Sequence, residues 1–506
     1  MSTPAPPTIW DRSRLGITVG TVVLIFLAAL EALAVTTVMP VVADDLDGEA
    51  LFAVAFSATL ATGVIGMVAS GAWSDSGGPR PPLYTAVALF AVGLLVSGLA
   101  LDMYTFIAGR LIQGLGAGGQ TVALYVVVAR LYPPQLHGRI FAAYAAAWVV
   151  PSMVGPFLAG AVTEFLHWRW AFLGVAVLTV AAFALVAVRL RGVSLAADAG
   201  DPGRTGEPAS DSGEPASAPV VTASVPVVTA SVPVAPVSVP VVPEARAGRA
   251  RRRVGVAVRL LLAVLVAVCA VSVGFAADLP AALGGPGTGA AIAVVAIMVI
   301  GVALLPLLPV GSLRAASGLP SVVLMRAIAA GAFFAAEAYV PRLLIDRFEF
   351  SPTVAGLALT LSALGWSGAS AVQGRYGDLL GSARIVTLST VLMAVGFSSA
   401  LAVSILGADP WIVVTGWFFA GAGMGLLYPR LTVLTLAYST TADEGFNSSA
   451  LSIADSTGSA VLIAVAGLGF VLLPIGGSGY ITVYLLAIGL LLLALLPGLR
   501  MGDGRR

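Results

Sequence analysis

The sequence contains no lysine: all 26 basic residues in its 506 are arginine. A P-loop needs a lysine for the nucleotide phosphates, and Schiff-base chemistry needs a lysine amine. ATP-driven pumping by this chain and pyridoxal-phosphate chemistry are therefore excluded. The single cysteine, Cys269, permits no intrachain disulfide. The two histidines, His137 and His167, lack the spacing of an H-E-x-x-H zinc hydrolase. We expect no metal and no cofactor.

Charge is also scarce, since 10% of the residues are charged and 58% are hydrophobic. A soluble domain carries about 25% charged residues, because its surface must be covered with polar groups. The composition therefore excludes a cytosolic enzyme, a nucleic-acid binder and a secreted domain. It predicts a polytopic membrane protein that is not an enzyme.

Apolar runs long enough to span a bilayer, about 20 residues each, occur throughout the chain. We predict an all-α membrane protein with fourteen spans, six before residue 190 and eight after residue 253. The predicted spans are 16–40, 50–73, 83–101, 104–131, 139–163, 169–189, 254–276, 288–310, 320–345, 353–373, 384–406, 410–438, 446–473 and 479–499.

Arginine placement predicts the orientation of these spans, because short cytoplasmic loops retain positive charge. Arginines precede the first span and flank every second loop, whereas the alternate loops are mainly acidic. Both termini are therefore expected in the cytoplasm, and we expect a multi-pass protein of the plasma membrane. The even number of spans agrees with this orientation.

Four regions follow from the spans and from composition. Residues 1–190 form an N-terminal six-helix bundle, and 311–506 form a C-terminal one. Between them lie a linker, 191–253, and two extra helices, 254–310. The linker is rich in Pro, Val and Ser, with VVTASVP occurring twice, so it is expected to be extended and disordered. It is interpreted as a tether or as a proline-motif docking site for a partner.

The two six-helix regions repeat one another in sequence. The loop after the second span contains Gly71, Asp75, Gly78 and Arg80, and the loop after the tenth contains Gly374, Asp378, Gly381 and Arg384. The fourth and twelfth spans open with glycines at equal offsets: Gly109, Gly114, Gly116 and Gly118, then Gly416, Gly421, Gly423 and Gly425. Two pseudo-symmetric halves are typical of secondary transporters, which expose a central site alternately to each side of the membrane.

These motifs resemble those of the major facilitator superfamily, and among its members the fourteen-helix drug:proton antiporters. The loop Gly71–Arg80 resembles the superfamily's gating motif. The fourth-helix motif matches at Arg110, Gln113, Gly114, Gly116 and Gly118, and the antiporter motif at Gly155, Pro156 and Gly160. The resemblance implies proton-coupled export, with Arg110 controlling the protonation of a nearby acid.

Ionisable residues within spans are costly, at least about 2.5–3.5 kcal/mol each at the bilayer centre, so each one suggests a function. The proton-coupling candidates are Glu31, Arg110, Glu337 and Asp455. Glu31 could instead contact substrate or form a structural hydrogen bond, and Glu337 could contact a cationic substrate. Arg110 could simply join two helices, and Asp455 could belong to a satisfied polar cluster. The candidates for lining the substrate cavity are Gln113, Gln120, Thr121, Trp366 and Trp417.

The sequence therefore favours a monomeric secondary transporter, most simply a proton-coupled exporter of amphipathic or hydrophobic small molecules. Its partners would be the substrate, protons and membrane lipid, with no nucleic acid. A facilitator or proton symporter that imports a metabolite is the alternative. A membrane-embedded enzyme or receptor is the third hypothesis.

Overall fold

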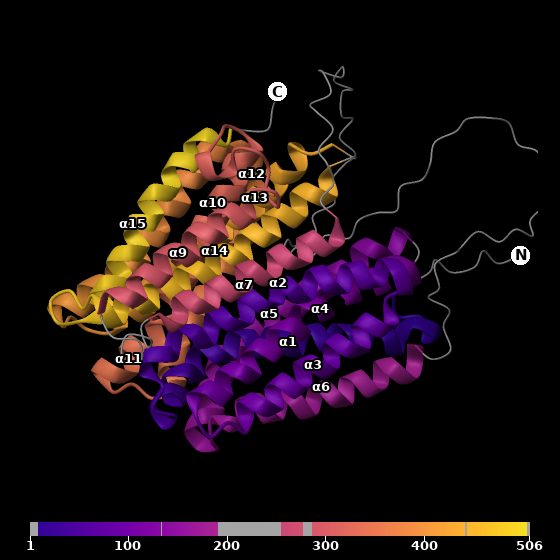
Figure 1. Ribbon diagram of the computed structural model, residues 1–506, viewed down its shortest axis with the longest axis horizontal. Coiled ribbons are helices and arrows are strands. Elements are labelled where there is room, and N and C mark those ends of the chain that lie inside the picture. Colours follow the sequence, from indigo (N-terminus) through magenta and orange to yellow (C-terminus); the bar gives the residue numbers. More distant parts are fainter. Residues whose placement is uncertain (1–8, 133, 191–254, 277–285, 441–442, 503–506) are drawn as a thin grey trace, which may run out of the picture.

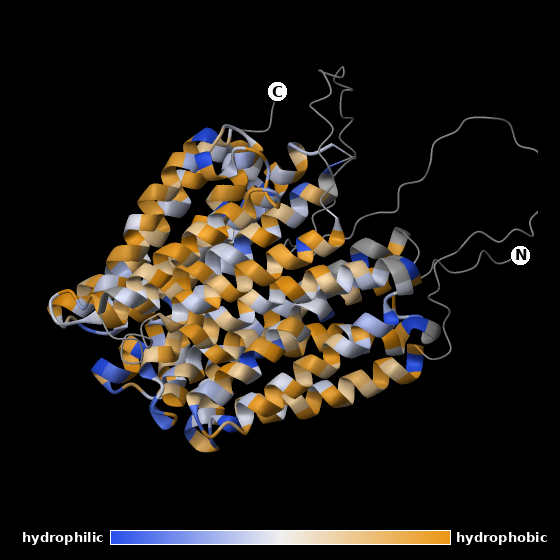
Figure 2. Cartoon of the chain, in the orientation of Figure 1, coloured by the Kyte–Doolittle hydropathy of each residue, from blue (hydrophilic) through white to orange (hydrophobic). Residues whose placement is uncertain are grey.

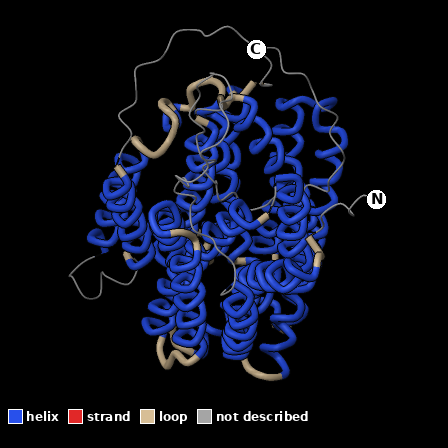
Figure 3. The backbone as a smooth tube through the Cα atoms, turned by 90° about the vertical axis from the view of Figure 1, so that its right-hand side faces the viewer, coloured by secondary structure: helices blue, strands red, loops and turns tan. Residues whose placement is uncertain are grey.

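The computed structural model describes residues 9–132, 134–190, 255–276, 286–440 and 443–502. The regular elements in these ranges are helices joined by loops and turns (Figure 3). Figure 1 shows them side by side along one direction. The predicted all-α architecture is confirmed.

The N-terminal bundle contains six helices that match the six predicted spans. They are α1 (Arg12–Asp45), α2 (Phe52–Gly77), α3 (Arg80–Gly98), α4 (Met103–Leu131), α5 (Pro134–Phe165) and α6 (Arg169–Leu190). Helix α6 ends where the predicted linker begins. We call this end of the bundle the linker end and the other the opposite end.

The C-terminal bundle repeats this arrangement with two differences in helix boundaries. Its elements are α10 (Leu319–Ala338), α11 (Val340–Phe348), α12 (Pro352–Leu406), α13 (Trp411–Ala437), α14 (Glu444–Leu472) and α15 (Gly479–Arg500). The ninth predicted span is divided at Tyr339 into α10 and α11, because Pro341 cannot donate the next helical hydrogen bond. The tenth and eleventh spans form α12, whose backbone leaves the helical conformation at Gly381.

Helix packing confirms that the two bundles are built alike. In the first bundle α4 packs against α2, and α1 against α5 and α6. In the second, α13 packs against α12, and α10 against α14 and α15, which are the equivalent pairs. Gly78 and Gly381, at matching positions of the repeated loop, have φ of 79° and 71°, a backbone conformation that glycine adopts without strain.

Two extra helices, α7 (Val256–Phe275) and α9 (Pro286–Leu304), pack against each other. Helix α7 also packs against α2 and α14, so the pair covers one of the two seams between the bundles. The other seam is formed by α5 and α12.

In the described part of the chain, thirteen helices are long and apolar enough to cross a membrane, and Thr288–Leu304 of α9 is a shorter apolar stretch. The sides of the molecule are largely hydrophobic in Figure 2, and polar residues are concentrated near the helix ends. Large apolar side chains such as Val177 and Val188 of α6 and Met298 of α9 are more than half exposed. An apolar perimeter of this kind is expected of a surface that faces lipid.

Candidate functional site

A buried ion pair joins α1 and α4 in the N-terminal bundle. Arg110 donates through Nη1 to the Glu31 carboxylate, and the two side chains are 4% and 3% exposed. The same nitrogen donates to Gln113 Oε1 at 2.7 Å, and Nε donates to the Ala55 carbonyl of α2 at 3.2 Å. Three helices therefore meet at one guanidinium. The structure thus brings Arg110 into contact with Glu31, which is 79 positions away in the sequence, and with Gln113, which is 3 positions away.

The glycines of α4 allow this close approach. A Cβ built on Gly116 would lie 2.6 Å from the Cα of Phe90 in α3, and one on Gly118 would lie 2.9 Å from the Cα of Gly63 in α2. Thr62 of α2 donates to the Leu111 carbonyl at 2.9 Å beside Gly114. These glycines hold α4 between two neighbours, and so determine where Arg110 lies.

The remaining polar residues of α4 follow Arg110 along the helix, toward the linker end. Gln120 donates to the Leu24 carbonyl of α1 at 3.1 Å, while its Oε1 is buried without a hydrogen bond. The Gln113 Nε2 is likewise buried without an acceptor. Thr121 is half-buried and donates to Ala117 of its own helix. The predicted polar stripe therefore faces α1 and α2, and part of its hydrogen-bonding capacity is unused.

A second buried ion pair lies in the C-terminal bundle. Arg326 of α10 donates through Nε to Asp455 of α14 at 2.7 Å. Tyr428 of α13 donates to the same carboxylate oxygen at 2.7 Å, and its ring lies 3.4 Å from the guanidinium carbon. Trp366 of α12 packs edge-on to the Tyr428 ring at 5.0 Å. Asp455 is therefore held by two donors from two helices.

Arg326 is not among the residues predicted from the sequence, whereas Asp455 is. The signal was available, since Arg326 is an ionisable residue within the predicted span 320–345, as Arg110 is within 104–131. Its partner could not be read from the sequence, because the two residues are 129 positions apart.

Glu337 differs from the other acids within the spans. It is half-buried on α10, and the indole nitrogen of Trp417 on α13 faces it without a hydrogen bond of ordinary geometry. In the described part of the chain no arginine pairs with it. Trp417, predicted to line the cavity, is fully buried between Phe333 and Phe397.

Contacts between the two bundles are concentrated at the opposite end. Arg342 of α11 pairs with Glu49 across the interface at 3.2 Å and with Asp346 at 3.1 Å. Its guanidinium carbon lies 4.8 Å from the ring centre of Phe52 in α2 and at the same distance from Phe470 in α14.

Helices α5 and α12 also meet at this end. Thr353 donates to Glu164 at 2.6 Å. A Cβ built on Gly160 would lie 2.6 Å from the Thr353 Cα, and one built on Gly356 would lie 2.9 Å from the Pro156 carbonyl carbon. Gly155 lies instead against Leu30 of α1. The predicted antiporter motif therefore forms part of the contact between the bundles.

The family model described as "Major Facilitator Superfamily" matches residues 21–338, which is more than half of the chain. The chain belongs to the Major Facilitator Superfamily. This assignment agrees with the sequence-based prediction of a transporter rather than an enzyme.

Curated relatives of this superfamily member match less than a third of the chain. The MFS efflux transporter aclA of Aspergillus oryzae is 36% identical over 148 residues, 29% of this chain and 27% of that protein. The Acurin A biosynthesis cluster MFS-type transporter of Aspergillus aculeatus is 33% identical over 147 residues, 29% of this chain and 26% of that protein. The chain thus spans about a quarter of the length of these curated relatives.

Solved structures share the superfamily fold over nearly the whole chain. An auto-inhibited POT family peptide transporter has a TM-score of 0.62 at 14% identity, and the match covers 96% of this chain and 98% of that one. A D-xylose-proton symporter has a TM-score of 0.58 at 13% identity, with 99% of both chains covered. At these identities the likeness establishes the fold.

The two repeated loops, for which the sequence predicts a gating motif, lie at the linker end. Arg80 donates to the Leu190 carbonyl at the end of α6, and Arg130 of α4 donates to the Ser74 carbonyl at 2.9 Å. Gly71 lies near Val122 of α4, whereas Gly374 faces open space. The side chains of Asp75 and Asp378 lie outside the described part of the structure.

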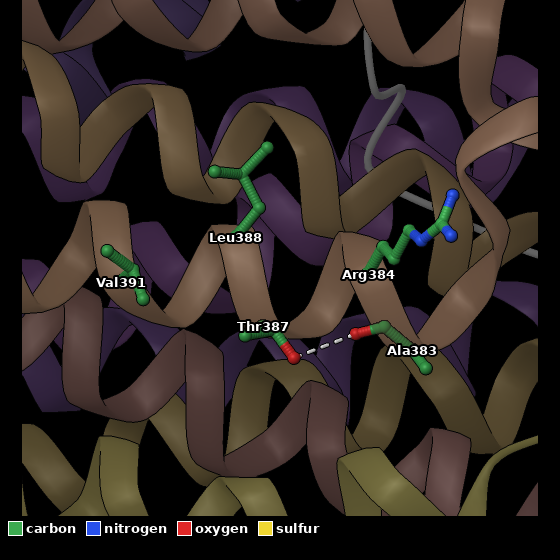
Figure 4. A pocket seen from close by; sticks show the side chains of 5 residues that line it. All are labelled: Ala383, Arg384, Thr387, Leu388 and Val391. Atoms are coloured by element: carbon green, nitrogen blue, oxygen red, sulfur yellow. Dashed lines mark hydrogen bonds between the residues drawn. The ribbon is translucent and has the colours of Figure 1, made fainter.

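Arg384, the last residue of the second repeated loop, borders a shallow depression on the surface of α12 (Figure 4). Its lining, Ala383, Arg384, Thr387, Leu388 and Val391, comes from one exposed face of that helix. Thr387 donates to the Ala383 carbonyl at 3.0 Å, which is a contact within the helix. This depression contains none of the acids that lie within the spans.

Proposed function

We propose that the protein is a proton-coupled antiporter that exports amphipathic or hydrophobic small molecules from the cytoplasm. The observation that carries the proposal is the buried contact of Glu31, Arg110 and Gln113 in a chain of this superfamily. Similarity to relatives such as the A. oryzae efflux transporter supports export as the direction of transport.

Glu31 is the proton carrier in this proposal. An ionised carboxylate away from water is stabilised by the Arg110 guanidinium, and protonation removes the attraction that holds the pair together. Arg110 then retains Gln113 and the Ala55 carbonyl, so its charge is not left without acceptors. A proton on Glu31 would thus loosen α1 from α4 without leaving the arginine unsatisfied.

The alternating movement would use the contacts at the opposite end. With the termini in the cytoplasm, as the arginine distribution favours, Glu49–Arg342 and the α5–α12 contact close the extracellular side. The described conformation would then face the cytoplasm. Substrate would enter from there, and protonation from outside would return the empty transporter.

The test is transport in inverted membrane vesicles, whose interior corresponds to the outside of the cell. Acidification of the interior should drive uptake of compounds from an amphipathic panel of positive, zero and negative charge. Glu31→Gln should abolish gradient-driven uptake, because it cannot exchange a proton, while the protein still inserts in the membrane. Glu349→Gln, the same change at an exposed residue, is the control and should transport normally.

Two results would contradict the proposal. Unchanged gradient-driven uptake in Glu31→Gln would exclude Glu31 from coupling. Uptake driven only in the other direction, with the interior alkaline, would favour the importer.

A further inference from the structure

The two repeated loops at the linker end use their last arginine differently. Arg80 donates to the Leu190 carbonyl at the end of α6. Arg384 is exposed, and no hydrogen bond or ion pair joins its side chain to another residue in the described part of the chain. One of the two arginines is therefore used within the protein, and the charge of the other is available to a ligand.

A difference of one residue between the loops explains the two orientations. Arg80 follows Gly78 by two residues, whereas Arg384 follows Gly381 by three. With 3.6 residues per turn, the additional residue rotates the arginine by about 100° around its helix. Helix α3 packs against α6, and α12 packs against α15, so the scaffolds are equivalent. Arg384 is therefore turned away from the position at which Arg80 reaches its neighbouring helix.

An apolar stripe begins at Arg384 and follows the exposed face of α12. Leu388, Val391 and Val395 come four, seven and eleven residues later, a spacing that places them on one side of a helix. Their side chains are 43%, 53% and 46% exposed. In Figure 4 the Arg384 guanidinium lies at one end of the depression and Val391 at the other.

The length of this stripe matches one leaflet of a bilayer. The rise of 1.5 Å per residue separates Arg384 from Val395 by about 16 Å, and half of the hydrocarbon core is about 15 Å thick. Arg384 lies at the linker end of the span Leu379–Leu406, where headgroups would be. A charged end followed by an apolar stripe of this length fits the headgroup and one acyl chain of a phospholipid.

The charge at the head of the stripe favours an anionic lipid. The backbone of α12 leaves the helical conformation at Gly381, so Arg384 is in the first turn of a new helical segment, at the positive end of its dipole. A guanidinium can bind two oxygens of one phosphate. The residues that line the depression include no acid. The ammonium group of a zwitterionic headgroup would therefore meet a positive potential without a counter-charge.

We propose that Arg384 and the stripe Leu388, Val391 and Val395 bind an anionic phospholipid. The guanidinium holds the phosphate, and the stripe supports one acyl chain. With the termini in the cytoplasm, this lipid belongs to the cytoplasmic leaflet, where anionic headgroups and basic side chains attract each other. The choice of leaflet rests on that orientation, but the binding does not, and it requires neither substrate nor a proton gradient.

The experiment measures lipid preference at this position by fluorescence quenching. In the full-length protein, Cys269→Ser removes the single native thiol, and Val395→Cys provides a site for a bimane label at the inner end of the stripe. The protein is reconstituted in mixtures of phosphatidylglycerol and phosphatidylcholine, with brominated chains on one lipid at a time. Bromine quenches only a fluorophore that it contacts, so the quenching gives the relative association constant of the two lipids. Phosphatidylglycerol should be preferred about fivefold or more, as expected for one arginine at an anionic surface.

Three further variants in the labelled protein separate charge from structure. Arg384→Gln should reduce the preference for phosphatidylglycerol to about one, and Arg384→Lys, which keeps the charge, should retain most of it. Arg259→Gln is the matched control, because Arg259 is an exposed arginine in the first turn of α7. This variant should keep the full preference.

Three results would overturn the inference. They are equal association of the two lipids with the labelled protein, an undiminished preference in Arg384→Gln, and loss of the preference in inorganic phosphate but not in sodium chloride of the same ionic strength. The last result would identify a soluble anion as the ligand.

The outcomes also distinguish this site from the proposed function. A lipid preference that depends on Arg384, in a protein without gradient-driven transport, would retain the lipid site and reject proton-coupled export. Gradient-driven export by a protein without any lipid preference at this position would do the reverse.

Discussion

The two bundles share the hydrogen bonds that begin equivalent helices and differ in the charged residues that they bury. Asp102 caps α4 by accepting from the Thr105 amide at 2.8 Å, and Asp409, at the equivalent position, accepts from the Trp411 amide at 2.9 Å. Eight residues after these aspartates the pattern diverges, with Gly–Arg110 in one bundle and Gly–Trp417 in the other. The repeat therefore preserves what the helices need in order to pack, and allows the charged residues to change.

The buried pairs also lie toward different ends of the molecule. Arg110 is the eighth residue of α4, which begins at the opposite end, and Arg326 is the eighth residue of α10, which begins at the linker end. The first bundle joins its first and fourth helices, and the second joins its first and fifth. Equivalent scaffolds thus carry ionic contacts at different depths.

Among the variants that test this difference, Arg110→Met is expected to have the largest effect on the stability of the protein. Glu31 would remain buried without its cation, which costs about 3–5 kcal/mol. The double variant Arg110→Met, Glu31→Gln should recover much of this loss, because neither charge remains. Thermal unfolding of the purified protein measures both variants. Equal stability of the single and double variants would show that the pair does not act as a unit.

A substitution at the contact between the two bundles is expected to have a smaller effect on stability. Gly356→Ala places a methyl group against the Pro156 backbone, and overpacking of this kind costs about 1–3 kcal/mol. Because the contact closes the opposite end, this variant should shift the equilibrium away from the described conformation and change the transport rate. Gly368→Ala, on the same helix but facing open space, is the control. Similar rates for both variants would show that the α5–α12 contact does not limit transport.

The smallest effect concerns the Asp102 cap of α4 and depends on pH. Hydrogen bonds from the Thr105 amide and hydroxyl hold the pKa of Asp102 below its ordinary value. The ionised cap therefore stabilises the folded state above the ordinary pKa of about 3.9, and its contribution is lost as the pH falls through the lower folded-state pKa. Asp102→Asn should remove this part of the pH dependence of unfolding. Identical unfolding profiles for the variant and the wild type between pH 6 and pH 3 would contradict this.

Most of the architecture was predictable, because span length, hydrophobicity and glycine spacing are local properties of the sequence. The break at Tyr339 was less accessible: Pro341 was visible, but whether proline bends or ends a helix depends on its neighbours. The partners of Glu31 and Asp455 could not be derived, because pairing depends on how distant helices rotate against one another. The aromatic residues near Glu337 were identified singly, and their proximity to it is a property of the folded bundle.

Because the base of each buried pair is an arginine, only the acid of that pair can change its protonation state. A guanidinium keeps its proton at any physiological pH, whereas a lysine in the same surroundings could release one. The net charge of each pair can therefore change through its acid and not through its base. Of the four protonation states that an acid and a base could adopt together, each pair has access to two. The occupancy of Glu31 or Asp455 by a proton would then define the charge of its site completely.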